Sequence, residues 1–178
     1  MKEITINDLN INPCLEIGRN WMLITAGDEK KSNSMTASWG SIGALWDAGV
    51  NGGAVTTIYV RPSRYTDSFI DTNDCYSLCF FDEDYRKDLS FMGTYSGRDI
   101  DKVSKTNLHL DYIDGVPYYK EAKLVIICKK VYKGKIEKEG FIDKKIIDAY
   151  YKTDSEHIYN NNSMHNVYIG KIIKVLSK

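Results

Sequence analysis

The apolar positions of the chain fall into short runs that are typical of β-strands. Residues 21–26 form one such run, which ends at a Gly-Asp pair. Residues 33–40 then alternate Met35, Ala37 and Trp39 with hydroxyl side chains, which is the period of a half-buried strand. The pattern predicts a strand, a hairpin loop and a second strand.

Segments rich in β-branched and aromatic side chains predict further strands. These are residues 54–60, 75–81, 124–132 and 167–176. The second of them is almost continuously apolar, so we expect it to be buried on both faces. Asp114 and Gly115 lie between short β-like segments and predict a hairpin turn. We expect the short, glycine-rich segment 41–46 to be a loop with a helical turn.

Helical spacing recurs in short segments between the predicted strands. Tyr65 and Phe69 lie four residues apart on one face of a predicted helix, which Ser63 or Thr66 could cap. The other two predicted helices are residues 82–93 and 143–151, and residues 101–106 predict a short helical turn. Six or seven strands with three short helices indicate a mainly β fold, either a β-barrel with short helices or a sandwich. The length of 178 residues fits a single domain.

Charge and hydropathy exclude several classes of partner. Lys and Arg together number 24, as do Asp and Glu, so no net field attracts nucleic acid or an anionic membrane. No apolar run approaches the roughly 20 residues of a membrane helix. The first residues lack the apolar core of a signal peptide. We therefore expect a cytoplasmic protein that binds neither nucleic acid nor membranes.

The four cysteines are scattered singly, and no His or Cys lies at a zinc-binding spacing from them. We expect buried, reduced thiols and no metal site. The chain also lacks a dinucleotide-binding glycine motif after a strand, a Walker A loop and a nucleophile elbow. Rossmann, P-loop and α/β-hydrolase chemistry are therefore excluded.

Residues 61–66 combine positive charge with a predicted helix start. Arg61 and Arg64 are forked donors, and Ser63 and Thr66 carry hydroxyl groups. Unpaired N–H groups at a helix N-terminus, together with arginines, match the oxygens of a phosphate. The alternative is that Ser63 only caps the helix while the arginines pair with nearby aspartates. These residues alone favour neither interpretation over the other.

The glycine-flanked loop at residues 93–102 offers Ser96, Arg98 and Lys102 to an anion. Its alternative interpretation is an ordinary connection between helices with surface charges. His157 and His165 lie near the start of the last predicted strand and could carry a proton or contact a phosphate. The alternative for these histidines is simple solvation in an asparagine-rich loop.

Four stretches resemble motifs of the flavin reductase-like family and follow one another in the order that this family has. Members of the family have an FMN-binding split barrel and include flavoredoxin. They are residues 33–40, 59–66, 96–102 and 165–170. The resemblance covers most of the chain, from about residue 21 to the last residue. It implies one FMN-binding domain over residues 1–178 and a homodimer with FMN near the subunit interface.

The resemblance also implies roles for individual residues. The flavin would be lined by Asn33, Met35, Thr36, Ala37, Ser38 and Trp39. The phosphate would be held by Arg61, Ser63 and Arg64, with Tyr65, Ser96 and Lys102 beside it. His165 corresponds to a histidine that lies near the nicotinamide or flavin ring in some members, so we take it as the catalytic candidate.

These features predict an NAD(P)H-dependent flavin oxidoreductase that passes electrons from NADH or NADPH through FMN to an acceptor. One alternative is a flavoredoxin-like electron-transfer protein that a partner redox protein reduces. A third is a β interaction domain without a cofactor.

Overall fold

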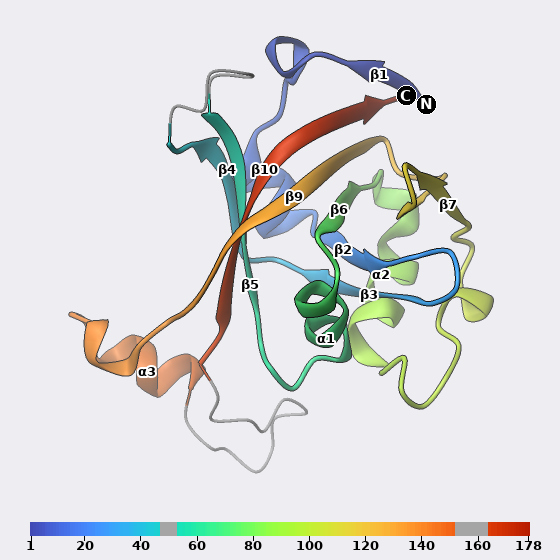
Figure 1. Ribbon diagram of the computed structural model, residues 1–178. Coiled ribbons are helices and arrows are strands. Elements are labelled where there is room, and N and C mark those ends of the chain that lie inside the picture. The colour runs from blue at the N-terminus through green and yellow to red at the C-terminus, as the bar shows by residue number, and fades with distance from the viewer. Residues whose placement is uncertain (47–52, 152–163) are drawn as a thin grey trace.

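The computed structural model describes residues 1–46, 53–151 and 164–178, in which antiparallel strands dominate (Figure 1). The strands of the large sheet are β1 (Lys2–Ile4), β2 (Met22–Gly27), β3 (Ser32–Ala37), β4 (Gly40–Ala44), β5 (Ala54–Val60), β6 (Cys75–Phe80), β9 (Leu124–Lys135) and β10 (Asn166–Ser177). A separate hairpin consists of β7 (Leu110–Ile113) and β8 (Val116–Tyr119). The α-helices are α1 (Tyr65–Thr72), α2 (Arg86–Thr94) and α3 (Lys145–Tyr150).

The large sheet is rolled up, because its two outer strands follow each other in the chain. Its order is β3-β2-β6-β9-β10-β5-β4, with β1 also paired to β10. In a flat sheet, β3 and β4 would lie about 29 Å apart, at about 4.8 Å per strand. Only Ser38 and Trp39 connect them, and three peptide units span about 11 Å. The sheet must therefore curl until its edges meet, which confirms the predicted β-barrel with short helices.

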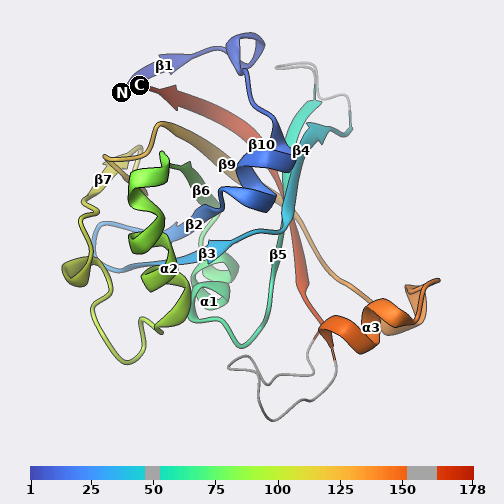
Figure 2. The ribbon, with the colours of Figure 1, turned by 180° about the vertical axis from the view of Figure 1, so that it is seen from behind.

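The sheet buries side chains on both faces. Met22 and Ile24 of β2 point into the barrel core, whereas Leu23 between them belongs to a second apolar cluster. That second cluster contains Leu89 of α2 and Tyr119 of β8, which cover the outside of the sheet. Figure 2 shows α2 in front of β2 and β3, while α3 stands away from the barrel. Strand β6 contributes to both clusters, as its continuous apolar run predicted.

Polar atoms inside the barrel are paired with one another. The hydroxyl groups of Thr56 and Tyr76 lie 2.9 Å apart, and Thr56 Oγ1 lies 3.2 Å from the Sγ of Cys128. Gly170 of β10 provides the space for this group, since a Cβ there would lie 2.4 Å from the Tyr76 hydroxyl. The ladder between β9 and β10 shifts register at Ile169 and Gly170. The buried hydrogen bonds thus depend on a glycine at this bulge.

Several local predictions are confirmed. Asp114 and Gly115 form the two-residue turn between β7 and β8, with φ of 51° and 76°. Both residues have positive φ, as the favoured hairpin turn requires. The strands around residues 22–27 and 54–60, the buried strand β6 and the long strand β9 also lie where the pattern placed them. Among the residues described, no helix has the length and apolarity needed to span a bilayer.

Other local predictions are wrong. The segment predicted as a loop at residues 41–46 contains strand β4, because β5 supplies hydrogen-bond partners along Gly40–Ala44. Neither Ser63 nor Thr66 caps α1. Arg64 occupies the N-cap position without a side-chain hydrogen bond there, and the Thr66 hydroxyl instead accepts a hydrogen bond from Asn33.

Candidate functional site

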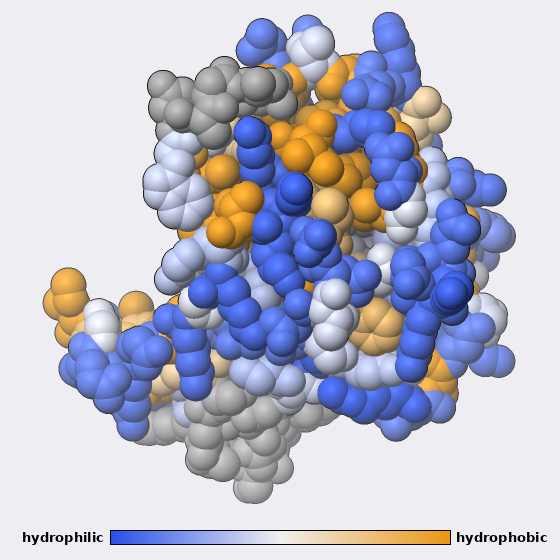
Figure 3. All heavy atoms as spheres, viewed as in Figure 1, coloured by the Kyte–Doolittle hydropathy of each residue, from blue (hydrophilic) through white to orange (hydrophobic). Residues whose placement is uncertain are grey.

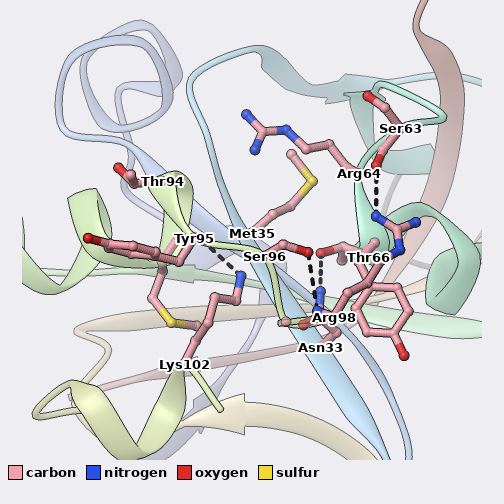
Figure 4. A pocket seen from close by; sticks show the side chains of 13 residues that line it. Asn33, Met35, Ser63, Arg64, Thr66, Thr94, Tyr95, Ser96, Arg98 and Lys102 are labelled. Atoms are coloured by element: carbon pink, nitrogen blue, oxygen red, sulfur yellow. Dashed lines mark hydrogen bonds between the residues drawn. The ribbon is translucent and has the colours of Figure 1, made fainter. Parts of the chain in front are cut away.

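A cavity of about 250 Å³ lies between β3, the start of α1 and the loop that follows α2 (Figure 4). Three cations line it, namely Arg64, Arg98 and Lys102, together with hydroxyl and amide side chains. The described residues that line it include no Asp or Glu. The cavity therefore suits an anion that accepts several hydrogen bonds. We call it the cationic cavity.

The loop after α2 packs directly on β3. A Cβ at Gly97 would lie 2.1 Å from the Oδ1 of Asn33, and a Cβ at Gly93 would lie 3.1 Å from the Cβ of Thr36. Asn33 also donates a hydrogen bond of 2.7 Å to the Oγ1 of Thr66 in α1. Glycines at these positions let the loop backbone approach the strand, so three segments distant in sequence enclose one cavity.

Lys102 is buried at the base of the cationic cavity, with 5% of its surface exposed. Its Nζ donates hydrogen bonds of 2.5 Å to the carbonyl oxygen of Ser34 and 2.9 Å to that of Met92. Burial, and then the nearby charge of Arg64, lower its pKa to about 8. An ammonium group has three donors, so a third N–H is available to a ligand.

Arg64 connects the cationic cavity to a second one of about 320 Å³. Its Nη1 donates a hydrogen bond of 3.1 Å to the carbonyl oxygen of Gly93. The second cavity, which we call the strand cavity, is lined by Trp21, Thr36, Ala37, Ser38, Arg64, Leu89, Ser90, Gly93 and Thr94. Arg64 and Thr94 line both cavities, so the two adjoin. Together they offer one ligand an end with three cations and an end where Arg64 is the one charged residue among the described lining.

Arg98 forms part of the wall opposite Lys102. Its Nη1 donates a hydrogen bond of 3.1 Å to the carbonyl oxygen of Ser63, and its guanidinium lies 4.8 Å from the centre of the Tyr65 ring. Figure 4 shows Ser63, Arg98 and Thr66 gathered on one side of the cavity and Lys102 and Tyr95 on the other.

Most of the predicted binding residues thus line one of these two cavities. In the cationic cavity they are Asn33, Met35, Ser63, Arg64, Tyr65, Ser96 and Lys102. In the strand cavity they are Thr36, Ala37 and Ser38, again with Arg64. Trp39, Arg61 and His165 line neither of the two.

These three residues meet instead beside α3. Arg61 Nη2 donates a hydrogen bond of 2.6 Å to the carbonyl oxygen of Tyr150, and its guanidinium lies 5.2 Å from the centre of the Tyr151 ring. The Nδ1 of His165 lies 2.9 Å from the Tyr151 hydroxyl. The Trp39 ring centre is 5.0 Å from that of His165. Arg61 therefore ties the end of α3 to the barrel.

The buried His165 ring is held in its neutral form. Burial, and then the positive charges of Arg61 and Arg64, lower its pKa to about 4. At neutral pH it therefore carries no charge and its Nδ1 can share a proton with Tyr151. His157, the other histidine singled out from the sequence, lies outside the described residues.

Sequence reasoning missed Trp21, Thr94 and Tyr95 as cavity residues. The glycine-flanked loop was a usable signal for Thr94 and Tyr95, because both lie between Gly93 and Gly97. Trp21 stands at the head of an apolar run, where the pattern indicates only burial. Its place in the strand cavity depends on the turn that precedes β2.

Comparison with solved structures identifies the fold. Flavoredoxin from Methanosarcina acetivorans is 20% identical over 96% of this chain and 75% of its own, with a TM-score of 0.64. An FMN-binding protein from Thermus thermophilus is 16% identical over 88% of this chain and 69% of its own, with a TM-score of 0.61. A Shewanella frigidimarina protein assigned as a flavin reductase with a split barrel domain is 17% identical over 97% and 77%, with a TM-score of 0.62.

No protein-family model matches the chain, and no curated protein sequence matches it. The similarity is therefore one of structure at low sequence identity. The rolled antiparallel sheet agrees with the split barrel named for the Shewanella frigidimarina protein. The chain has the split-barrel fold of the flavin reductase-like proteins and flavoredoxins.

Proposed function

We propose that the protein binds FMN, with the phosphate in the cationic cavity and the ring system in the strand cavity. The observation that carries this proposal is the cationic cavity itself. Arg64, Arg98 and Lys102 converge there without a carboxylate among the described lining residues. Similarity to solved FMN-binding and flavoredoxin structures gives independent support.

The residues present fit the proposed cofactor. Arginine forks and a lysine match a phosphate, and Ser63 and Ser96 add hydroxyl donors. The strand cavity, of about 320 Å³, reaches the usual size of small-ligand sites, which is about 300–1,000 Å³, and the adjoining cationic cavity adds about 250 Å³. Ser38 could hydrogen-bond to the polar edge of the ring, and Ala37 leaves room beside it. The Thr36 hydroxyl donates to the carbonyl oxygen of Leu89, so it could only accept a hydrogen bond from the ring.

The proposed activity is transfer of electrons from NADH or NADPH to an acceptor. Bound flavin would supply the redox chemistry, whereas the protein supplies position and polarity. The cations fix the phosphate end, and the wall formed by β3 and α2 fixes the other end. His165 lines neither cavity, so the catalytic role predicted for it is not part of this proposal.

A flavoredoxin-like carrier is the second candidate, because solved flavoredoxins share this fold. In that case a protein donor, and not a pyridine nucleotide, would reduce the flavin. The proposal places both candidates in the same binding site. They differ in the electron donor.

The visible spectrum of the protein titrated with FMN tests the binding proposal. Saturable binding with a shifted flavin spectrum is expected, and a protein without affinity for FMN would overturn the proposal. Anaerobic mixing of the FMN complex with NADH or NADPH then separates the two candidates. Bleaching of the flavin within the time of a catalytic cycle indicates the reductase. Reduction by a protein donor alone indicates the carrier.

We also propose that the protein forms a homodimer. Ile142 is 100% exposed, and Ile146 and Tyr150 of α3 are 42% and 54% exposed. Apolar side chains gathered on a projecting element are typical of a surface that another chain covers. Figure 3 shows apolar atoms on the projection that α3 forms in Figure 1.

A further inference from the structure

We infer that Trp21 is the aromatic contact for the flavin ring and that Arg86 positions it. This inference rests on the proposed FMN site and deepens it. Trp21 lines the strand cavity together with Thr36, Ala37 and Ser38 of the β3 region. It is the one tryptophan among the residues that line this cavity. A flat indole beside a row of small and hydroxyl side chains suits a heteroaromatic ring.

The backbone of Trp21 is held in an unfavourable conformation. Its φ of 70° lies in the left-handed region, which bulky side chains rarely adopt. Such a conformation persists only where the surrounding structure fixes it, and it is enriched at binding sites. The left-handed turn lies directly before β2, which begins at Met22. It sets the direction in which the indole leaves the chain.

Arg86 supplies the contacts that fix this turn. Its Nη1 donates hydrogen bonds of 2.8 Å to the carbonyl oxygen of Arg19 and 3.0 Å to that of Asn20. Its guanidinium lies 3.1 Å from the centre of the Trp21 ring. Arg86 therefore holds both the two peptide carbonyls before Trp21 and one face of the indole.

The same helix forms the opposite wall of the strand cavity. Arg86 is the first residue of α2, and Leu89, Ser90 and Gly93 of that helix line the cavity. Contacts from Arg86 to Trp21 thus fix the spacing between the two walls. Arg86 is not itself among the residues that line the strand cavity. Its role is therefore positioning, through Trp21.

Trp39 is the alternative candidate for the aromatic contact, because the alternating pattern of residues 33–40 and the family resemblance both indicate it. It lies two residues beyond the end of β3, is 38% exposed, and packs on Tyr150 and His165 at ring-centre distances of 5.3 Å and 5.0 Å. It lines neither cavity. Replacing Trp21 and replacing Trp39 should therefore affect flavin binding differently, and the two substitutions form a matched pair of variants.

Titration of the full-length protein with FMN and with riboflavin tests the inference. Riboflavin lacks the phosphate and therefore reports on the ring contact alone. Trp21→Ala should weaken both ligands by about tenfold or more, whereas Trp39→Ala should change neither by more than about threefold. Trp21→Phe should restore part of the affinity. Equal losses in the two alanine variants, or none in Trp21→Ala, would overturn the inference.

Fluorescence quenching supplies a readout that does not depend on the Trp21→Ala variant. In Trp39→Phe/Trp46→Phe, the remaining indole is Trp21, and FMN should quench most of its emission. In Trp21→Phe/Trp46→Phe, the remaining Trp39 should be quenched much less. The opposite order would contradict the assignment even if Trp21→Ala does not fold.

Arg86→Ala tests the positioning role. We expect weaker riboflavin binding, a red-shifted Trp21 emission in the single-tryptophan protein, and an unchanged affinity for inorganic phosphate. Arg86→Lys should not rescue the emission, because an ammonium group lacks the planar fork. Wild-type levels of both affinity and emission in Arg86→Ala would refute the positioning role. A wild-type protein that binds no FMN would refute the proposed function itself.

Discussion

Arg61 and Arg64 are three positions apart in the chain and serve different parts of the molecule. Arg64 lines both cavities and donates a hydrogen bond to the carbonyl oxygen of Gly93. Arg61 points to the end of α3, where it donates to Tyr150. Val60 ends β5 and Arg64 precedes α1, so the chain turns between the two arginines. Their side chains therefore leave in different directions.

Arg64→Ala should weaken FMN binding by about 1.5–3 kcal/mol, because a charge-assisted hydrogen bond to the phosphate is lost. Arg61→Ala is the matched control and should change FMN affinity by less than about 0.5 kcal/mol. Isothermal titration calorimetry of both variants measures the difference. A larger loss in Arg61→Ala than in Arg64→Ala would place the phosphate near α3.

The lowered pKa of His165 makes stability depend on pH. A histidine in an unfolded chain titrates near pH 6.5, whereas the pKa of folded His165 is about 4. Between these values the unfolded state binds more protons, so the free energy of unfolding falls as pH falls from 6.5 to 4. We expect a loss of roughly 1–2 kcal/mol after allowance for solvent screening.

Urea unfolding of wild type and His165→Gln at pH 7 and pH 4.5 isolates this contribution. The variant lacks the titrating group, so its stability should fall less over the same interval. Parallel pH profiles for the two proteins would show that another group is responsible.

Residue-level patterns predicted most of the cavity walls but not their assembly. The sequence alone indicated three segments of the site. They are the hydroxyl-rich stretch at residues 33–40, the pair Ser63 and Arg64, and the loop that contains Lys102. Two contacts could not be predicted. Lys102 is buried and donates to two backbone carbonyl groups, and Arg61 donates a hydrogen bond to the end of α3. Both facts depend on contacts between residues far apart in the chain.

At the scale of elements, Gly170 of β10 leaves the space that side chains of β6 and β9 occupy. The Tyr76 hydroxyl occupies the space beside Gly170, and a Cβ there would also lie 2.8 Å from the Cβ of Cys128. Both neighbours are buried in the barrel core. A side chain at this position therefore has no room unless the bulge in β10 moves.

Gly170→Ala should destabilise the protein by about 1–3 kcal/mol through overpacking. Gly43→Ala is the matched control, since Gly43 lies in β4 and a Cβ there meets no atom within 4 Å. Its effect should be within about 0.5 kcal/mol. Thermal unfolding of both variants provides the comparison. Equal melting temperatures would contradict the packing described for Tyr76.

Strands with a strong local pattern were predictable, and those that depend on a partner were not. The two-residue period of β3 and the β-branched run of β5 specify strands by themselves. Gly40–Ala44 has neither feature, and it is a strand because β5 pairs with it from Ala54 onward. Helix α3 was predicted from its spacing, yet its apolar side chains are largely exposed.

At the scale of the whole molecule, the exposed side chains of α3 test the proposed dimer. Ile146→Glu should weaken association at least about tenfold, because it would bury a charge in an apolar contact. Ile173→Glu is the control, since Ile173 is 44% exposed on β10. Sedimentation velocity across a concentration series measures association. A monomeric wild-type protein, or equal effects in both variants, would contradict this interface.

The overall topology was beyond reach of local patterns. Alternation and turns favoured a barrel or a sandwich equally, and only the resemblance to a known family favoured the split barrel. The pairings that assemble the sheet join β10 to β5, and β6 to β2 and β9. They connect residues that are far apart in sequence, so no short window of the chain contains them.

The central place of β10 in the sheet has a consequence for synthesis. It pairs with β9, β5 and β1, although it is the last strand in chain order. Until the ribosome has released residues 166–177, β5 and β9 each present an open edge to other chains. The barrel therefore closes only after these residues have left the ribosome, and until then the two open edges favour pairing with other chains.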